Sequence, residues 1–259
     1  AEAYRESFEK FTSLIRPDGC LLIKKGINVT PRLQEGVKKY TYSVTEIADF
    51  YAENIRICDG NITFDFVGPE IRIPDVELGV PVKVNIENGV AAMAIAWLNG
   101  VKPEDLKKGM ATFAGPRRRF DFHLKTDQVV LIDDYAHHPQ EIAATLAAAK
   151  NYPHKKLWCV FQPHTYTRTK AFLDQFAQAL SAADEVVLAD IYAARETDTL
   201  GISSADIAER IEKLGTKAHY FKSFDEIETF LLENCMHGDL LITMGAGDIV
   251  KVGENLLGE

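Results

Sequence analysis

Apolar side chains recur at three- and four-residue spacings at the start of the chain. The stripe consists of Tyr4, Phe8, Phe11, Leu14 and Ile15. This spacing predicts a helix over residues 2–15 whose apolar side faces a core. A turn at 17–19 and the apolar run CLLIKK after it predict a short buried strand.

Strand patterns replace the helical pattern between Lys38 and Leu78. Short segments there are rich in β-branched and aromatic residues, which predicts an antiparallel meander with turns at Asp59–Gly60 and Gly68–Pro69. Helical patterns follow at about 86–98 and 103–113.

After residue 120, apolar strand segments alternate with amphipathic helical segments. The expected strands are 129–133, 156–161, 185–190, 218–222 and 239–244. Such alternation is typical of an α/β domain whose doubly wound sheet is mostly parallel. The sequence therefore predicts two domains, 1–119 and 120–259, with the boundary near Arg119 and the small antiparallel sheet in the first.

The composition is that of a soluble globular protein, with 46% hydrophobic and 26% charged residues. The net charge of -9 repels phosphate backbones and anionic lipids, so that neither nucleic acid nor a membrane is an expected partner. No apolar stretch is long enough to span a membrane. The four cysteines stand far apart without a CxxC pair, which indicates reduced thiols and a cytoplasmic location.

Polar, reactive side chains follow four of the predicted strands. The loops are 133–139 (DDYAHHP), 162–170 (QPHTYTRTK), 191–199 (IYAARETDT) and 245–248 (GAGD). The carboxyl ends of parallel strands meet at one edge of a sheet, where ligands bind in open α/β folds. We therefore expect these loops to form one site.

Two of these loops carry the residues that we expect to contact a substrate. They are Tyr135, His137, His164 and Arg168. Arg168 lies at the predicted start of a helix, where its charge and a hydroxyl cap from Thr165 suit an anion, although it could also be a surface residue without a ligand. A zinc site of His137, His138 and His164 is conceivable, but adjacent histidines cannot easily both face one metal, and no metal site is expected.

Three further features allow two interpretations each. Asp133 and Asp134 form either a solvated strand end or a site that binds a ribose or a cation-bearing group, with only one of them facing a cleft. The arginines at 117–119 reach phosphate oxygens or form a solvated linker, and Phe120 should be buried and orient the arginine before it. The glycines at 245–247 permit close approach of a ligand or form a plain tight turn, since the third glycine of GxGxxG is missing.

Taken in order along the chain, seven segments resemble the Mur ligase family. They are VPVKVNIENGVAAMAIA (80–96), GPRRRF (115–120), DDYAHHP (133–139), FQPHTYTR (161–168), ADIYAARE (189–196), GISS (201–204) and MGAGDI (244–249). The resemblance implies the last part of the family's central ATP-binding domain, followed by its whole C-terminal Rossmann-like domain. The sequence contains no GxxxxGK[ST] phosphate loop.

The resemblance is to the branch of the family that joins L-alanine to UDP-N-acetylmuramate in peptidoglycan precursor synthesis. It implies that ATP phosphorylates the lactyl carboxylate, and that the amine of L-alanine then displaces phosphate from the acyl phosphate. It also implies Mg²⁺, with the magnesium ligands and the phosphate loop upstream of this chain. We therefore expect this chain alone to be inactive as a ligase.

The resemblance also implies roles for individual residues. Asn85 would contact adenine, Arg119 would lie near the nucleotide phosphates, and Asp134 would hold the ribose. The residues that resemble those holding the muramyl substrate or product are Tyr135, His137, His164 and Arg168. The chain departs from the family pattern at two positions, because Val84 stands where His is common and Thr165 stands where Arg is common. The first departure removes a polar contact near the base, and the second removes an anion-binding arm.

Three other functions are alternatives. The related recycling ligase joins a tripeptide to the same nucleotide sugar. A two-metal phosphoesterase would also place Asp and His at parallel strand ends. A nucleotide-binding module without catalysis is the third.

Overall fold

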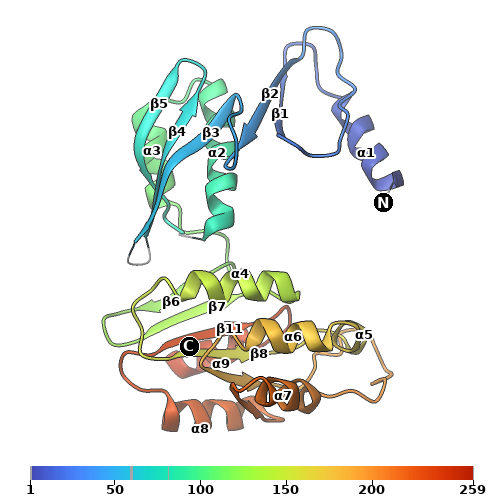
Figure 1. Cartoon of the computed structure of the whole chain (residues 1–259), viewed down its shortest axis with the longest axis vertical. Coiled ribbons are helices and arrows are strands. Elements are labelled where there is room, and N and C mark those ends of the chain that lie inside the picture. Colours follow the sequence, from blue (N-terminus) through green and yellow to red (C-terminus); the bar gives the residue numbers. More distant parts are fainter. Residues whose placement is uncertain (1, 59–60, 81, 259) are drawn as a thin grey trace. The chain divides into compact units, whose positions relative to one another are not determined.

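The computed structural model describes residues 2–58, 61–80 and 82–258. The chain divides between Phe113 and Ala114 into two compact units, called here the first and the second unit. Each unit is built around its own sheet (Figure 1). The predicted mixed α/β class is confirmed.

The first unit contains a five-stranded sheet in the order β1-β2-β3-β4-β5. Its strands are β1 (Cys20–Lys24), β2 (Lys38–Ser43), β3 (Phe50–Cys58), β4 (Asn61–Gly68) and β5 (Ile71–Glu77). β3, β4 and β5 pair antiparallel, which confirms the later part of the meander and its turn after Gly68. The turn expected at Asp59–Gly60 lies outside the described residues.

The prediction was wrong for the start of the meander, because β2 pairs parallel with both β1 and β3. Residues 44–49 bring the chain back beside β2, so that Tyr42 pairs with Phe50. Asp49 holds this return, since its Oδ2 accepts hydrogen bonds from the backbone N–H and the hydroxyl of Thr41, each at 2.7 Å. The pattern of β-branched residues identifies strands but not their relative direction.

Two helices, α2 (Lys83–Leu98) and α3 (Pro103–Thr112), pack on this sheet. Its core includes the buried side chains of Phe50, Phe64, Phe66, Val90 and Met93. Pro103 begins α3, and acidic residues follow it in the first turn, where they face the positive end of the helix dipole. These helices were predicted within a few residues of their bounds.

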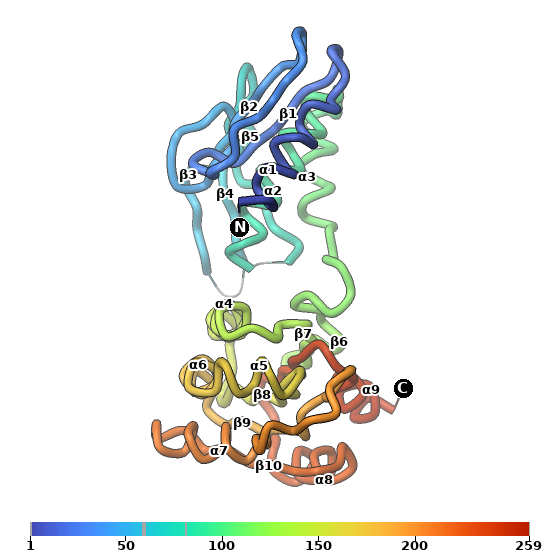
Figure 2. Tube along the Cα trace, turned by 90° about the vertical axis from the view of Figure 1, so that its right-hand side faces the viewer, coloured from blue at the N-terminus to red at the C-terminus, as the bar shows by residue number. Residues whose placement is uncertain are grey.

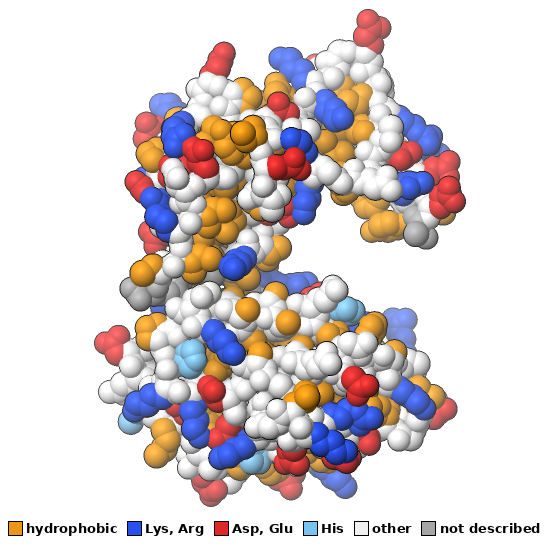
Figure 3. Space-filling model, viewed as in Figure 1, with side chains coloured by type: hydrophobic (Ala, Val, Ile, Leu, Met, Phe, Trp, Pro, Cys, Tyr) orange, Lys and Arg blue, Asp and Glu red, His pale blue; other side chains and the backbone are white. Residues whose placement is uncertain are grey.

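The first helix, α1 (Glu2–Thr12), differs from the prediction in its surroundings. It ends at Thr12 rather than at residue 15, and its apolar stripe is not buried. Tyr4 is 73% exposed and Phe11 is 68% exposed, and Figure 3 shows apolar side chains at the surface around α1. Periodicity identifies the apolar side of a helix but not whether another element covers it.

The second unit contains a six-stranded sheet in the order β10-β9-β8-β11-β7-β6. Its strands are β6 (Asp121–Lys125), β7 (Val130–Asp134), β8 (Leu157–Phe161), β9 (Glu185–Leu188), β10 (Lys217–Tyr220) and β11 (Leu240–Met244). The five predicted strands pair parallel, and β6 adds an antiparallel edge strand that was not predicted. The pairing register of β6 with β7 shifts between Phe122 and Leu124, which interrupts the alternation of side chains between the two faces of this short strand.

Helices cover both faces of the second sheet. They are α4 (Pro139–Ala149), α5 (Tyr166–Ala171), α6 (Leu173–Leu180), α7 (Ser204–Lys213), α8 (Phe224–Asn234) and α9 (Val250–Leu257). α4, α6 and α7 pack in a row on one face, and α8 and α9 pack together on the other (Figure 2). Every residue of the central strands β8 and β11 is buried, which confirms the predicted doubly wound, mostly parallel sheet.

Two observations bear on the environment of the chain. No helix in the described part of the chain is long and apolar enough to cross a membrane. Burial raises the pKa of the Cys159 thiol, which lies in the core of the second unit. This cysteine therefore packs as a small apolar side chain.

A buried glutamate at the amino end of β9 makes stability depend on pH. Glu185 is 6% exposed, and its carboxylate lies 2.6 Å from Lys156 Nζ and 3.4 Å from His219 Nε2. Burial alone would raise the pKa of Glu185, but the hydrogen bonds and charges of its basic partners outweigh burial, and the pKa is lowered. Because the folded pKa lies below the ordinary value of 4.5, this stabilisation is present above that pH and is lost as the pH falls through the folded pKa.

We therefore expect Glu185→Gln to lower the Tm by several degrees at pH 7 and to flatten its dependence on pH in the acid range. Glu212→Gln changes an exposed glutamate of α7 and is the matched control, which should follow the wild-type curve. Thermal unfolding of the three proteins between pH 7 and pH 3 measures the effect. Parallel curves for wild type and Glu185→Gln would contradict it.

Candidate functional site

The four polar loops converge at one edge of the second sheet, as predicted. β7, β11, β8 and β9 are neighbours, and their last residues are in register. Met244 pairs with both Asp134 and Phe161, and Phe161 pairs with Leu188. The loops that follow these strands therefore leave the sheet at the same level, at its carboxyl edge.

Aromatic rings from three of these loops contact one another in a row. Tyr135 packs edge-on against His137 with ring centroids 5.4 Å apart, and His137 lies 6.2 Å from His164. His164 stacks on Tyr192 at 5.5 Å. The structure thus brings together three of the predicted substrate residues in what we call the ring cluster (Tyr135, His137, His164 and Tyr192). Tyr192 was not singled out from the sequence, where nothing distinguishes it from other loop tyrosines.

Three buried polar atoms in the segment after β8 have no hydrogen-bond partner among the described residues. They are Gln162 Oε1, His164 Nδ1 and Arg168 Nη1. Proteins rarely leave buried polar atoms unpaired, because each unpaired atom costs free energy. Three such atoms within residues 162–168 suit a polar ligand that would complete the hydrogen bonding.

The surroundings of His164 favour its neutral form. Its pKa is lowered, first by burial and then by the positive charges of Arg168 and His137, while Glu196 acts in the opposite direction. Arg168 stays charged, as a guanidinium does in proteins. A cation beside a neutral imidazole suits an anionic oxygen that lies next to a neutral polar group.

The backbone after His164 adopts an unusual conformation. Thr165 has a φ of +67°, which is uncommon for a β-branched residue. Its N–H donates to the Tyr192 carbonyl at 2.9 Å, and the Tyr192 N–H donates to the Pro163 carbonyl at 2.8 Å. The expected hydroxyl cap is not formed, and Arg168 lies in the last turn of the short helix α5. An anion here would therefore be bound by the charge of Arg168 rather than by a capped helix start.

The Arg118 side chain forms hydrogen bonds within the second unit and is not free to bind a phosphate group. Its guanidinium donates to Asp133 Oδ2 at 2.9 Å and to the carbonyls of Gly245 at 2.7 Å and Gly247 at 3.0 Å. Asp133 is 1% exposed and also accepts a hydrogen bond from the Thr243 hydroxyl at 2.7 Å. This role was not predicted from the sequence. The available signal was the aspartate at the end of a buried strand, because a buried carboxylate needs a cationic partner.

Neither carboxylate at the end of β7 is solvated. Asp134 is 6% exposed, and its two oxygens accept hydrogen bonds from the backbone N–H groups of Phe120 at 2.8 Å and Ala136 at 2.7 Å. Burial raises the pKa of Asp134, although these hydrogen bonds and the charge of Arg119 oppose the effect. The interpretation as a solvated strand end is therefore wrong for both residues. Asp133 is bound to the chain's own Arg118, and ribose binding by Asp134 stays a prediction.

Arg119, like Arg118, lies beside the Tyr135 ring; the guanidinium carbon of Arg118 is 5.1 Å from the centroid of that ring. The neighbouring Phe120 is 2% exposed, as predicted, and its N–H is fixed by Asp134. The Arg119 guanidinium is exposed and lies 5.5 Å from the centroid of the Tyr135 ring. Arg119 can therefore reach a ligand at this edge, whereas the Arg118 guanidinium is already occupied.

The glycines after β11 serve close packing within the protein. Gly245 has a φ of +147°, and a Cβ on it would lie 2.7 Å from the Gln162 carbonyl oxygen. A Cβ on Gly247 would collide with Gln162 Oε1 and lie 2.9 Å from the Tyr192 ring. The sequence allowed either close approach of a ligand or a plain tight turn, and the structure fits the tight turn. Without Cβ atoms, these glycines let the loop pack against Gln162 and Tyr192.

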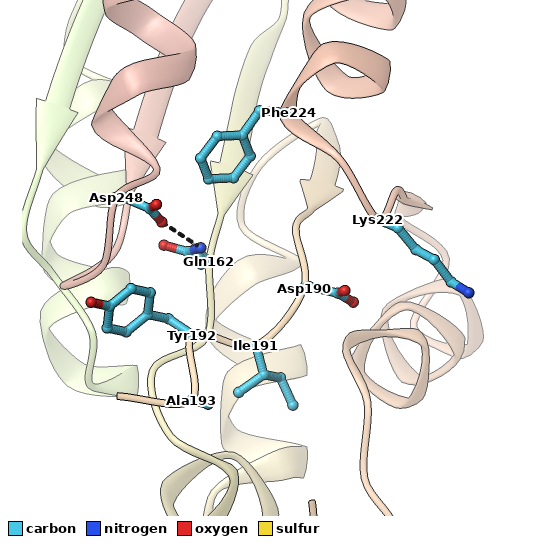
Figure 4. Close-up of a pocket in the computed structure, with 8 residues that line it drawn as sticks. All are labelled: Gln162, Asp190, Ile191, Tyr192, Ala193, Lys222, Phe224 and Asp248. Carbon is cyan, nitrogen blue, oxygen red and sulfur yellow. Dashed lines mark hydrogen bonds between the residues drawn. The ribbon is translucent and has the colours of Figure 1, made fainter. Parts of the chain in front are cut away.

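A pocket of about 380 Å³ opens beside Tyr192 (Figure 4). Its lining residues are Gln162, Asp190, Ile191, Tyr192, Ala193, Lys222, Phe224 and Asp248. Gln162 Nε2 donates to Asp248 Oδ1 at 3.0 Å, and Asp190 and Lys222 lie across from them in the figure. Because Tyr192 forms a wall of this pocket and also stacks on His164, the pocket adjoins the ring cluster.

His138 does not join the ring cluster. Its ring packs edge-on against Phe172 at 4.9 Å, and its Nδ1 accepts the Gln140 N–H at 3.5 Å at the start of α4. The three-histidine zinc site is therefore not formed. Within residues 2–58, 61–80 and 82–258, no three His, Cys, Asp or Glu side chains form a group that could hold a metal ion.

Asn85 lines a separate pocket within the first unit, with a volume of about 210 Å³. Its walls are mainly apolar and are formed by Leu78, Gly79, Val80, Asn85, Asn88, Gly89, Ala92, Gly109, Met110 and Phe113. Asn85 Nδ2 donates to the Val80 carbonyl at 3.1 Å, and Asn88 Nδ2 donates to Asn85 Oδ1 at 3.2 Å. Apolar walls with amide groups suit a planar base that has hydrogen-bonding edges. Asn88 was not singled out from the sequence.

Comparison with known proteins gives related sequences. The family model described as "Mur ligase, glutamate ligase domain" matches residues 118–247, about half of the chain. A UDP-N-acetylmuramate–L-alanine ligase of Parabacteroides distasonis is 80% identical over 212 residues, which are 82% of this chain and 46% of that protein. A protein of the same name from Phocaeicola vulgatus is 51% identical over 249 residues, which are 96% of this chain and 53% of that protein. The chain thus spans about half the length of the curated relatives it matches.

A solved structure shares the fold. The UDP-N-acetylmuramate-alanine ligase of Thermotoga maritima matches with a TM-score of 0.81 and 24% identity, over 99% of this chain and 54% of that protein. The matched region of the family model contains the ring cluster and both strand-end carboxylates. On the family model and the related sequences, the chain belongs to the Mur ligase family.

Proposed function

We propose that this chain is part of an ATP-dependent ligase that joins L-alanine to UDP-N-acetylmuramate in peptidoglycan precursor synthesis. The observation that carries the proposal is the set of unpartnered buried atoms around His164 and Arg168, at the edge where the family loops converge. The printed name of the relative at 80% identity supports L-alanine and UDP-N-acetylmuramate as the substrates.

In this proposal the muramyl substrate lies against the ring cluster. Arg168 would bind an anionic oxygen of this substrate, and His164 would bind a neighbouring polar group. Tyr135 and His137 would hold the substrate with their ring faces and edges.

The proposed ATP contacts are Asn85 in the first unit, and Arg119 and Asp134 in the second unit. The pocket around Asn85 fits adenine, because it combines apolar walls with two amide side chains. In the second unit Arg119 would approach the phosphates, and Asp134 would accept from the ribose hydroxyls in addition to its two backbone N–H groups. Residues 1–119 would then be the latter part of the central ATP-binding domain and 120–259 the C-terminal domain, in a cytoplasmic enzyme.

The reaction needs two displacements. The lactyl carboxylate attacks the γ-phosphorus of ATP and ADP leaves, which gives an acyl phosphate. The amine of L-alanine then attacks the acyl carbon and phosphate leaves, which gives the amide. Mg²⁺ would neutralise phosphate charge in such a reaction, but the described residues do not offer a site for it.

A two-metal phosphoesterase is not favoured, because it needs metal-binding clusters that the described part of the chain does not contain. The recycling ligase shares its nucleotide sugar with the proposed enzyme. It differs in the amine substrate, so the two are separated by which amine is consumed.

The direct test uses the intact ligase, extended to the length of its relatives. With ATP, UDP-N-acetylmuramate and L-alanine, we expect ADP, phosphate and the alanine amide in equal amounts by mass spectrometry. The tripeptide in place of L-alanine should give at most a few per cent of this rate, and this chain alone should give no amide. Amide formation from the tripeptide only, or phosphate release without an amide, would refute the proposal.

A further inference from the structure

The orientation of the His137 ring fixes which of its nitrogens can accept a proton. Its Nδ1 lies 2.9 Å from the Tyr135 carbonyl oxygen. A carbonyl oxygen can only accept, so Nδ1 must carry the hydrogen of this bond. In the neutral ring Nε2 is then an unprotonated acceptor, and no described residue donates a hydrogen bond to it.

The ring is held in this orientation by the start of α4. Glu141 Oε2 accepts the backbone N–H groups of His137 at 3.1 Å and His138 at 3.2 Å. The same oxygen lies 3.5 Å from His137 Nδ1. The His137 side chain is 24% exposed, and its ring meets those of Tyr135 and His164. His137 is therefore a fixed side chain that ligands can still reach.

Glu141 is suited to stabilise a protonated His137. Burial alone would raise the pKa of Glu141, but the backbone N–H groups and the charge of His137, with Arg119 further away, lower it. Glu141 is thus a carboxylate at neutral pH, next to Nδ1. If Nε2 takes up a proton, the positive ring lies beside this negative charge.

The other histidine of the ring cluster is poorly suited to the same task. His164 has a lowered pKa because it is buried and lies near Arg168, and its ring is stacked on Tyr192. The arginines at this edge, Arg118, Arg119 and Arg168, are donors only. The carboxylates nearby already accept hydrogen bonds within the protein: Asp134 from two backbone N–H groups, Glu196 from the N–H and hydroxyl of Thr167, and Asp248 from Gln162. His137 Nε2 is therefore the acceptor that the ring cluster offers to a donor on a ligand.

Amide formation requires such an acceptor. At neutral pH the α-amino group of an amino acid is an ammonium ion, which has no lone pair and cannot attack a carbonyl carbon. We propose that Nε2 of His137 accepts a proton from the ammonium group of the incoming L-alanine. The N–H bond breaks, the proton passes to Nε2, and the freed lone pair attacks the acyl carbon. As the bond between the acyl carbon and the phosphate oxygen breaks, a second proton passes from the nitrogen to the departing phosphate, which leaves as hydrogen phosphate. His137 then returns the proton to solvent. This role rests on the proposed function, since it concerns the second displacement of that reaction.

The tautomer is tested on this chain without any substitution in the ring cluster. Imidazole ¹⁵N shifts and couplings distinguish a hydrogen on Nδ1 from one on Nε2. We expect His137 to carry it on Nδ1 when neutral, with His138→Asn used to separate the signals of the adjacent rings. A hydrogen on Nε2 in the neutral ring would overturn the proposal.

The catalytic role is tested in the intact ligase with two matched variants. His137→Asn keeps a donor for the Tyr135 carbonyl and removes the acceptor at the Nε2 position. His138→Asn keeps an acceptor that can cap α4 and leaves the ring cluster unchanged. We expect His137→Asn to slow amide formation with L-alanine by about 10²- to 10⁴-fold, and His138→Asn to change it less than threefold.

Hydroxylamine separates the two displacements, because it is largely uncharged at neutral pH and needs no base. The hydroxamate formed from ATP, UDP-N-acetylmuramate and hydroxylamine should stay within threefold of wild type in His137→Asn. Equal loss of hydroxamate and amide, or no loss of either, would overturn the role of His137. A wild-type enzyme that forms neither product would instead refute the proposed function itself.

Discussion

Arg118→Ala is expected to lower the free energy of unfolding of the second unit by about 3–5 kcal/mol. The variant leaves Asp133, which is 1% exposed, without its cation, and leaves the carbonyls of Gly245 and Gly247 without their donor. Removing one partner of a buried ion pair is costly because the remaining charge stays away from water. A loss of this size is a large part of the stability of an ordinary domain.

Urea unfolding followed by tryptophan fluorescence measures this loss. Trp158 lies buried on β8, and Trp97 lies in the first unit, so a Trp97→Phe background reports on the second unit alone. Arg117→Ala changes an exposed neighbour and should cost less than about 0.5 kcal/mol.

Adding Asp133→Asn to Arg118→Ala should recover part of the stability, because it removes the unpaired charge. The free energy of unfolding of Arg118→Lys should lie between those of wild type and Arg118→Ala. One ammonium group cannot form all three hydrogen bonds that the guanidinium donates. If Arg118→Ala lowers the free energy of unfolding by less than about 1 kcal/mol, Arg118 does not stabilise the second unit through its bonds to Asp133 and the loop 245–248.

The parallel sheet of the second unit could be predicted from the sequence because its strands are short, apolar on both faces and separated by amphipathic helices. This periodicity also placed the four loops at one edge, which the register of Met244, Asp134 and Phe161 confirms. The edge strand β6 was not predicted, because its irregular pairing interrupts the alternation of inward- and outward-facing side chains on which strand predictions depend.

Features that depend on contacts between distant segments could not be predicted. The direction of β2 depends on the hydrogen bonds of Asp49 to Thr41, and the exposure of Phe11 depends on what covers α1. Arg118 and Arg119 look alike in the sequence, yet the first is bound to Asp133 and the second is exposed. Only the fold separates the structural arginine from the one available to a ligand.

Arg168→Ala is expected to weaken binding of UDP-N-acetylmuramate to the intact ligase by about tenfold to a hundredfold. Nη1 of Arg168 is buried without a partner in the described chain, and we expect a ligand to complete its hydrogen bonding. A hydrogen bond to a charged group contributes about 1.5–3 kcal/mol, and each 1.4 kcal/mol corresponds to a factor of ten in affinity. The neutral His164 beside it cannot replace the lost charge.

Lys170→Ala provides the matched control on the same helix. Lys170 is exposed, and its Nζ donates to the Leu200 carbonyl at 2.9 Å rather than toward the ring cluster. This variant should bind the muramyl substrate within threefold of wild type. The Tm of both variants should stay within a few degrees of wild type, so that any loss of affinity is a loss of contact.

Separate titrations of Arg168→Ala with UDP-N-acetylmuramate and with ATP test most directly whether the ring cluster holds the muramyl substrate. We predict a tenfold to hundredfold weaker Kd for UDP-N-acetylmuramate and a change below threefold for ATP, whose proposed contacts are Asn85, Arg119 and Asp134. An equal loss for both ligands, or a change below threefold for both, would contradict the assignment of this edge to the muramyl substrate.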